Sequence, residues 1–198
     1  MRTLRRKLIR QRILPASYER LNYIENTSTA YIDCGLQPKY TFDYEFKGFA
    51  FSGNTVLGYF YTSDKYQYRF FYVYNNFYFD VGHKRIQIYV GNIPYIKNYH
   101  VKFGNYYIKS LYPEGFDITG TTFNETMNGI ELHNLLLLYN GGSKYVLGRI
   151  CLLKIKDRGK FIRDFIPVKR KSDGVIGMYD LVGRKFYTSP NGVAFTGG

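Results

Sequence analysis

The sequence predicts an all-β protein made of short antiparallel strands, and three observations support this prediction. Aromatic residues are unusually frequent, with 22 Tyr and 16 Phe but no Trp among 198 residues, and aromatic side chains favour strands. Apolar and polar residues alternate along several segments, which is the period of a half-buried strand. Turn-forming residues separate these segments about every 8–12 residues, as in an antiparallel sandwich or barrel.

The alternation is clearest at residues 42–48, where Phe42, Tyr44 and Phe46 face one side and charged residues face the other. Residues 99–104 alternate in the same way. Residues 150–156 are expected to place Cys151, Leu153 and Ile155 on one face. Two denser apolar runs, at residues 66–74 and 135–139, predict strands that are buried on both faces or lie at the centre of a sheet.

The closing segment of the chain predicts two further strands joined by turns. The first is expected to end at Pro167, and the next begins at Val175. The basic triplet 169–171 lies with Asp173 and Gly174 in the turn between them, because Asp-Gly is a strong turn signal. We therefore interpret the triplet as a solvated hairpin loop and not as a targeting signal.

Residues 1–14 form a basic arm that ends before Pro15, and residues 15–198 form one domain. The arm carries six of the 28 basic residues and no acidic one. Four large aliphatic residues are interleaved with them, so the arm could form a short amphipathic helix that orders when it docks on a partner. The expected anchoring residues are Arg2, Leu4, Arg5, Arg6, Lys7, Leu8, Ile9, Arg10, Arg12 and Ile13. A solvated tail without a role is the alternative.

Other features of the sequence bear on compartment and cofactors. Cys34 and Cys151 have no metal-binding or redox spacing, so both are expected to be free, buried and reduced, with one long-range disulfide as the alternative. No apolar run approaches the roughly 18 residues of a membrane span, and no apolar region of a signal peptide follows the basic N-terminus. We expect assembly in a cytoplasm, without a cofactor.

Two segments carry a resemblance to a known family. The first is "LPASYERLNYIENTSTAYIDCGLQP" at residues 14–38, and the second is "GRICLLKIKDRGKFIRDFIPVKRKSDGVIGMYDLVGRKFYTSPNGVAFTGG" at residues 148–198. Both resemble the ends of a LamG-like, concanavalin A-like jelly-roll domain that recurs in virion structural proteins of tailed phages of gut bacteria. Cys34 stands where that family usually has Thr. The resemblance does not extend to residues 39–147.

The resemblance implies a two-sheet antiparallel β-sandwich whose N- and C-terminal segments pair. It also implies a non-enzymatic structural protein of a phage virion, sometimes glycan-binding, and it gives no ligand residues. A head fibre or capsid-decoration component is the first choice, and a tail or baseplate protein is the second. The expected partners are other virion proteins and further copies of the same chain.

Catalytic motifs are nearly absent from the sequence. It has no phosphate-binding loop and no GxSxG elbow. His83, His100 and His133 lie far apart, so no metal site is predicted, and Asp80 and Asp117 are only weak calcium candidates. A glycosidase is the best enzymatic alternative, because such an enzyme needs two carboxylates.

That glycosidase would use Asp43 and Glu45, which alternate onto one strand face. The simpler interpretation of this pair is the solvated face of a strand. We therefore predict that the protein is not an enzyme.

A carbohydrate-binding adhesin is the main alternative function, because sugars stack on aromatic rings with a polar edge. The candidate residues lie at positions 59–61, 66–74 and 106–107 and include Tyr59, Tyr61, Tyr66, Tyr68 and Tyr72. Nucleic acid is disfavoured despite the net charge of +13, because the basic residues outside the arm are scattered along strands.

Overall fold

A computed structural model describes residues 13–39, 41–50, 67–73, 76–82, 84–89, 99–104, 107–112, 117–119, 134–138 and 148–198. Within these ranges the protein is all-β and has no helix, which confirms the predicted fold class at this level. No helix in the described residues could cross a membrane. The predicted anchoring residues from Arg2 to Arg12 lie outside the described residues.

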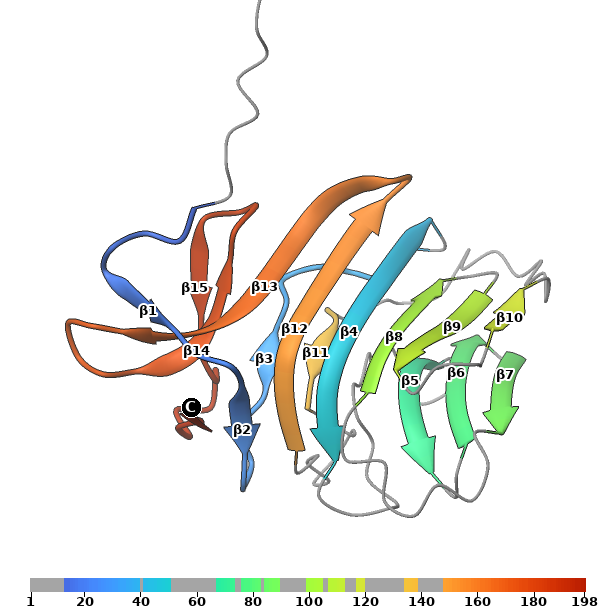
Figure 1. Cartoon of the computed structure of the whole chain (residues 1–198), viewed down its shortest axis with the longest axis horizontal. Coiled ribbons are helices and arrows are strands. Elements are labelled where there is room, and N and C mark those ends of the chain that lie inside the picture. Colours follow the sequence, from blue (N-terminus) through green and yellow to red (C-terminus); the bar gives the residue numbers. More distant parts are fainter. Residues whose placement is uncertain are drawn as a thin grey trace, which may run out of the picture.

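The strands are short near both chain ends and long in the middle of the main sheet (Figure 1). Their bounds are β1 Tyr18–Arg20, β2 Ile24–Asn26, β3 Ile32–Asp33, β4 Phe42–Ala50, β5 Gln67–Val73, β6 Asn76–Gly82, β7 Lys84–Tyr89, β8 Tyr99–Gly104, β9 Tyr107–Tyr112, β10 Asp117–Thr119, β11 Leu136–Leu137, β12 Gly148–Asp157, β13 Lys160–Arg170, β14 Ile176–Asp180, β15 Lys185–Tyr187 and β16 Thr196–Gly197.

The described strands form one large sheet and two small ones. The main path of the large sheet runs β10-β9-β8-β4-β12-β13-β14-β15; off this path β1 pairs with β13, β2 pairs with β12, and β16 pairs with β2. A three-stranded sheet has the order β5-β6-β7, and β3 pairs with β11. The pairings with a described register are antiparallel, including those between strands distant in sequence, such as β4 with β12.

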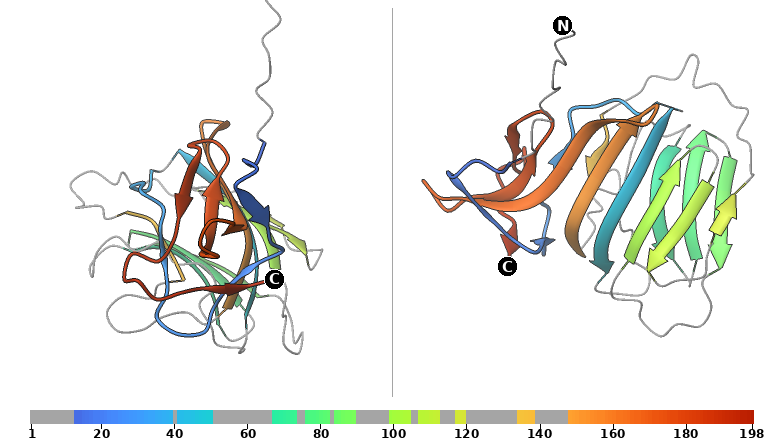
Figure 2. Two further views of the ribbon diagram at one scale, coloured as in Figure 1. Left: turned by 90° about the vertical axis from the view of Figure 1, so that its left-hand side faces the viewer. Right: turned by 45° about the horizontal axis from the view of Figure 1, so that its top comes forward.

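The three-stranded sheet packs against one face of the large sheet at β4 and β8 (Figures 1 and 2). The contact is made by Phe70 of β5, whose ring stacks on Phe103 of β8 at 4.5 Å between centroids. The ring of Phe103 in turn stacks on Tyr44 of β4 at 4.9 Å. Three aromatic rings in a column therefore join the two layers.

The alternation at residues 42–48 is confirmed by burial. Phe42, Tyr44 and Phe46 are at most 2% exposed, and the charged residues between them lie on the opposite face. Leucines of the β11 segment and Ile32 of β3 complete the same core cluster. One continuous apolar core thus lies on a single side of β4 and β12.

The two ends of the chain are joined, as the resemblance implied. β1 pairs with β13, and β2 pairs with both β12 and β16. The Tyr31 amide donates a hydrogen bond to Ser189 Oγ at 3.0 Å, and Asn191 Nδ2 donates one to the Thr29 carbonyl at 2.8 Å. Backbone pairing and side-chain bonds together fasten the segments that carry the family likeness.

In the hairpin with the basic triplet, the first strand ends later than predicted. β13 does not stop at Pro167 but continues to Arg170. Pro167 is tolerated because its carbonyl still accepts a hydrogen bond from the Leu21 amide, and proline lacks only the donor. The tight turn follows at residues 171–174, where Gly174 has φ of 73°.

Arg170 of this hairpin is occupied by contacts inside the protein. Its guanidinium pairs with the Asp173 carboxylate at 2.6 Å and lies over the Phe186 ring at 4.9 Å. Lys169 and Arg170 end β13, and only Lys171 lies in the turn, which corrects the prediction that the whole triplet is a loop.

The two cysteines are both free, but only Cys34 is buried. Cys151 is half-buried, which corrects the prediction that it shares the buried face of Leu153 and Ile155. A register shift between Ile150 and Leu152 is the cause, because the extra residue reverses the alternation. Burial raises the pKa of both thiols, so neither is an activated nucleophile.

The described chain begins at Ile13, which is 64% exposed, and is fastened from the next residue onward. Leu14 and Tyr18 pack on a second small cluster, built by Ile166, Val168 and Tyr179 on the opposite face of β13 and β14. The Tyr18 ring lies 4.8 Å from that of Tyr179. The described chain is therefore attached to the domain from Leu14 onward.

Candidate functional site

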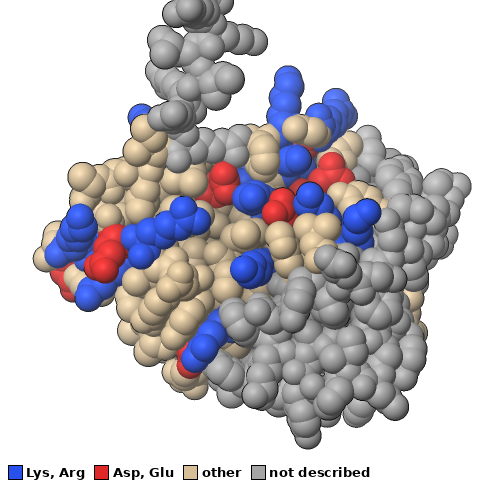
Figure 3. Space-filling view, viewed as in Figure 1, with Lys and Arg blue, Asp and Glu red and all other residues tan. Residues whose placement is uncertain are grey.

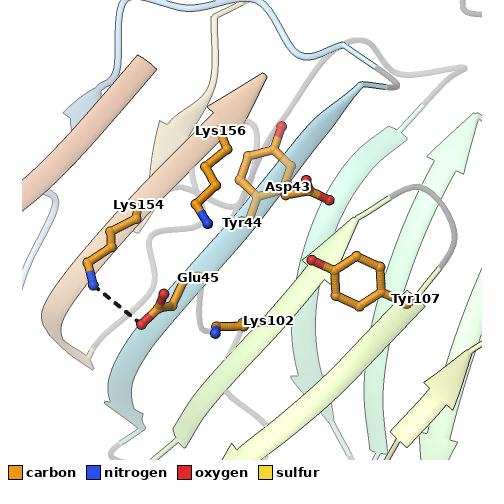
Figure 4. Close-up of a pocket in the computed structure, with 7 residues that line it drawn as sticks. All are labelled: Asp43, Tyr44, Glu45, Lys102, Tyr107, Lys154 and Lys156. Carbon is orange, nitrogen blue, oxygen red and sulfur yellow. Dashed lines mark hydrogen bonds and ion pairs between the residues drawn. The ribbon is translucent and has the colours of Figure 1, made fainter. Parts of the chain in front are cut away.

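A hollow of about 240 Å³ lies on the outer face of the large sheet, opposite the aromatic core (Figure 4). The side chains around it come from four adjacent strands: Asp43 and Glu45 from β4, Lys102 from β8, Tyr107 from β9, and Lys154 and Lys156 from β12. Basic and acidic groups also alternate over this part of the surface in Figure 3.

The strand register explains how these residues meet. In one row across the sheet Glu45 stands between Lys154 and Lys102. In the adjacent row Asp43 lies opposite Lys156 on one side and Gly104 on the other. Cross-strand neighbours of this kind have Cβ atoms about 4.5–5.5 Å apart, so their charges interact.

Gly104 allows two side chains that line the hollow to meet. A Cβ atom at this position would lie 2.8 Å from Asp43 Oδ1 and 3.1 Å from Tyr107 Cε1. The absent side chain therefore allows Asp43 and Tyr107 to approach each other over the β8 backbone. Any larger residue would push them apart or fill the hollow.

Glu45 is held as a carboxylate by its neighbours. His100 Nε2 lies 3.0 Å from Glu45 Oε1, and Lys154 Nζ lies 3.5 Å from the same oxygen. Partial burial raises the pKa of Glu45, but the hydrogen bond from His100 and the charges of Lys154 and Lys102 outweigh it, so this pKa lies below its ordinary value. Because an ionised carboxylate only accepts, His100 Nε2 carries the proton of this bond.

Tyr107 is held in its neutral form. Burial is the largest cause, and the charge of Asp43 together with its hydrogen bond to the phenol adds to it, so the pKa of Tyr107 rises to about 12. The phenol thus stays a hydrogen-bond donor to Asp43 at neutral pH.

Replacing Glu45 by glutamine is expected to remove a pH-dependent part of the stability. The folded-state pKa is lowered, so the ionised form stabilises the fold above pH 4.5, and this stability is lost as pH falls through the folded-state pKa. In urea unfolding at pH 7, the free energy of unfolding of the wild type should exceed that of Glu45→Gln by about 0.5–1 kcal/mol. The gap should close in acid, whereas the exposed Glu19→Gln control should show no such gap. An equal gap at pH 7 and pH 3 would contradict the ion-pair account.

The titration of Tyr107 gives a second expected outcome. In protein labelled with ¹³Cζ-tyrosine, one NMR resonance should titrate near pH 12 and be missing from Tyr107→Phe. Asp43→Asn should lower the pKa of Tyr107 only partway, because burial remains. Titration of Tyr107 near its ordinary value of 10.0 would show that the phenol is not enclosed.

The residues proposed from sequence are distributed unevenly relative to the hollow. Asp43, Glu45 and Tyr107 belong to it, and His100 borders it through Glu45. Tyr59, Tyr61, Tyr66, His83 and His133 lie outside the described residues. Tyr68 and Tyr72 fall in β5, Asp80 in β6 and Asp117 in β10, where the structure describes the backbone alone.

A second polar cluster, which sequence reasoning missed, joins the turn after β14 to the segment after β3. The Asp180 side chain is fully buried, and its Oδ1 accepts hydrogen bonds from the Asp164 and Val182 amides at 2.9 and 3.0 Å. Arg163 Nε lies 3.5 Å from Asp180 Oδ2 and also donates to the Cys34 carbonyl. The Asp before the tight turn predicts the turn itself, but no sequence signal points to the burial of this residue.

Glu45 suits an acceptor of hydrogen bonds and not the proton-donating acid of a glycosidase. A glycosidase acid must keep its proton near neutral pH, whereas the lowered pKa of Glu45 keeps that residue ionised. No group of three or more His, Cys, Asp or Glu side chains in the described ranges is arranged to hold a metal ion. Donors, acceptors and one aromatic ring nevertheless converge on a single space.

No protein-family model, curated protein or solved structure matches the chain. The described residues alone define the class of the protein, which is all-β with mostly antiparallel strands. The likeness to LamG-like virion domains remains a prediction that rests on the two end segments.

Proposed function

We propose that the chain is a non-enzymatic structural protein of a tailed-phage virion, a head-fibre or capsid-decoration component. Residues 1–14 act as the anchor on the particle, and the jelly-roll β-sandwich of residues 15–198 is displayed. The observation that carries the proposal is the attachment of the arm: Ile13 is exposed, while Leu14 and Tyr18 are fixed on the domain. An arm that docks through its aliphatic and basic residues would thereby hold the domain close to the particle.

Two physical terms favour docking by this arm. Each Leu or Ile buried against a partner contributes about 1.5–3 kcal/mol. Arginine adds bidentate contacts to carboxylates, for which its planar group is well suited. Display in many copies suits such a short anchor, because several weak attachments together bind far more tightly than one.

The test is particle incorporation of a chain that lacks residues 1–12. Leu14 stays in place because it packs in the second cluster, so the truncated domain should remain folded. Incorporation into particles assembled with the truncated chain should be lost while the urea unfolding midpoint is unchanged. Equal incorporation of the truncated and full chains would overturn the anchor, and cross-linking of the full chain to tail rather than head proteins would assign the baseplate location.

A further inference from the structure

We propose that the hollow over β4, β8, β9 and β12 binds one carboxylated sugar residue of an acidic polysaccharide. This site is not among the tyrosines at positions 59–72. It would stand whether or not the arm docks on a virion. Its residues are Asp43, Glu45, Lys102, Tyr107, Lys154 and Lys156 (Figure 4).

The size and shape of the hollow favour a single sugar ring. Its volume of about 240 Å³ is below the roughly 300–1,000 Å³ of pockets for drug-sized ligands. It lies on an open sheet face, so a longer chain could pass across it while one residue enters. The ring would enter over Glu45 and Lys102, beside the side chains of Asp43 and Tyr107, which meet above Gly104.

The chemistry of the lining matches a sugar in three ways. Carboxylates of Asp43 and Glu45 accept hydrogen bonds from ring hydroxyls, and lysine ammonium groups donate to ring and hydroxyl oxygens. The Tyr107 ring provides an apolar face for C–H groups. Its hydroxyl is already bonded to Asp43, which fixes the ring orientation before any ligand arrives.

The charge of the lining selects an acidic sugar. Three lysines face two carboxylates around the hollow. Glu45 is already paired with His100 and Lys154, and Asp43 with Tyr107. Lys156 Nζ lies over the Phe161 ring at 4.7 Å. A ligand carboxylate next to Lys102 would balance the excess positive charge, whereas a neutral sugar would leave it in place.

The site is held rigidly by its position in the sheet. β4 is paired on both sides, by β12 and by β8, and β8 is paired in turn with β9. Beneath the hollow, Tyr44 and Phe103 are stacked in the core. Little ordering is therefore required when a ligand binds, which favours affinity for a small group.

The test is calorimetric binding of a galacturonate oligosaccharide to the full chain at about 0.15 M salt, where long-range attraction is largely screened. The dissociation constant should increase at least about tenfold in Lys102→Met, because a charged hydrogen bond is lost. Lys169→Met is the matched control, since it removes the same charge from the exposed hairpin and should leave binding unchanged. Gly104→Ala, which would push Asp43 and Tyr107 apart, should also weaken binding.

Several outcomes would overturn the proposal. No binding of the galacturonate oligosaccharide would do so, and so would equal weakening by Lys102→Met and Lys169→Met, which would indicate attraction to net charge alone. Equal affinity for a neutral dextran oligosaccharide would exclude selection for the carboxylate. Urea unfolding of each variant distinguishes a lost contact from a lost fold, and Tyr107→Phe provides a second variant if Gly104→Ala does not fold.

Discussion

Asp180→Ala is expected to lower the free energy of unfolding by about 3–5 kcal/mol, because removing one partner of a buried ion pair leaves the other groups unsatisfied. The Asp180 side chain has no exposure to solvent, and its carboxylate accepts from two backbone amides and pairs with Arg163. Without it, the Asp164 amide would lose the carboxylate oxygen to which it donates inside the sheet, and Arg163 would lose the only carboxylate to which it is paired among the described residues.

The loss should also have a local signature. Gly183 lies so close to Asp180 that a Cβ would stand 2.6 Å from Oδ2, so the turn between β14 and β15 is built around this carboxylate. Hydrogen exchange of the Val182 amide should become faster in Asp180→Ala by more than the loss of global stability accounts for. Urea unfolding measured by circular dichroism gives the free energy.

Asp173→Ala is the control for this prediction. Asp173 also pairs with an arginine and also accepts from a turn amide, but it is exposed on the hairpin. Water replaces its contacts, so only a small change in stability is expected. Similar losses in Asp173→Ala and Asp180→Ala would mean that burial of the carboxylate is not what matters.

Phe103→Ala is expected to cost about 3–5 kcal/mol, as truncation of a buried phenylalanine generally does. Phe103 has no exposure and is the middle ring of the column that links β4, β8 and β5. Its loss would leave a cavity between the two layers. The half-buried Phe161→Ala is the control and should cost clearly less.

A double-mutant cycle sharpens this second prediction. Phe70→Ala removes the other side of the interlayer contact, so the two truncations should be less than additive, with a coupling of about 0.5–1.5 kcal/mol. Strict additivity in urea unfolding would indicate that the three-stranded sheet does not depend on this stack for its attachment to the large sheet.

Local periodicity made a large part of the fold predictable. The alternation of residues 42–48 and 99–104 predicted β4 and β8, and the dense run at 66–74 predicted β5. The run at residues 135–139 corresponds only to the two-residue β11. A two-residue period reports which face of a strand is buried, and each segment carries this pattern in its own sequence.

The same patterns could not predict the register of the strands or the tertiary contacts. Asp43 and Glu45 could be placed on one face, but the lysines around them come from β8 and β12, whose alignment with β4 is set by the whole sheet. The burial of Asp180 depends on Arg163 and on the segment after Asp33, and a lone Asp before a turn reads as solvated. The bulge that exposes Cys151 likewise leaves no periodic signal.

The joining of the two chain ends has a consequence during synthesis on the ribosome. β1, β2 and β3 pair with strands that follow them by more than 100 residues. At about 5–20 residues per second, the partners of the first strands are synthesised roughly 5–30 s later. Their unpaired edges would attract other nascent chains. Glu19, Arg20 and Glu25 place charges on these strands. Charged residues of this kind protect unpaired strand edges from association with other chains before their own partners are synthesised.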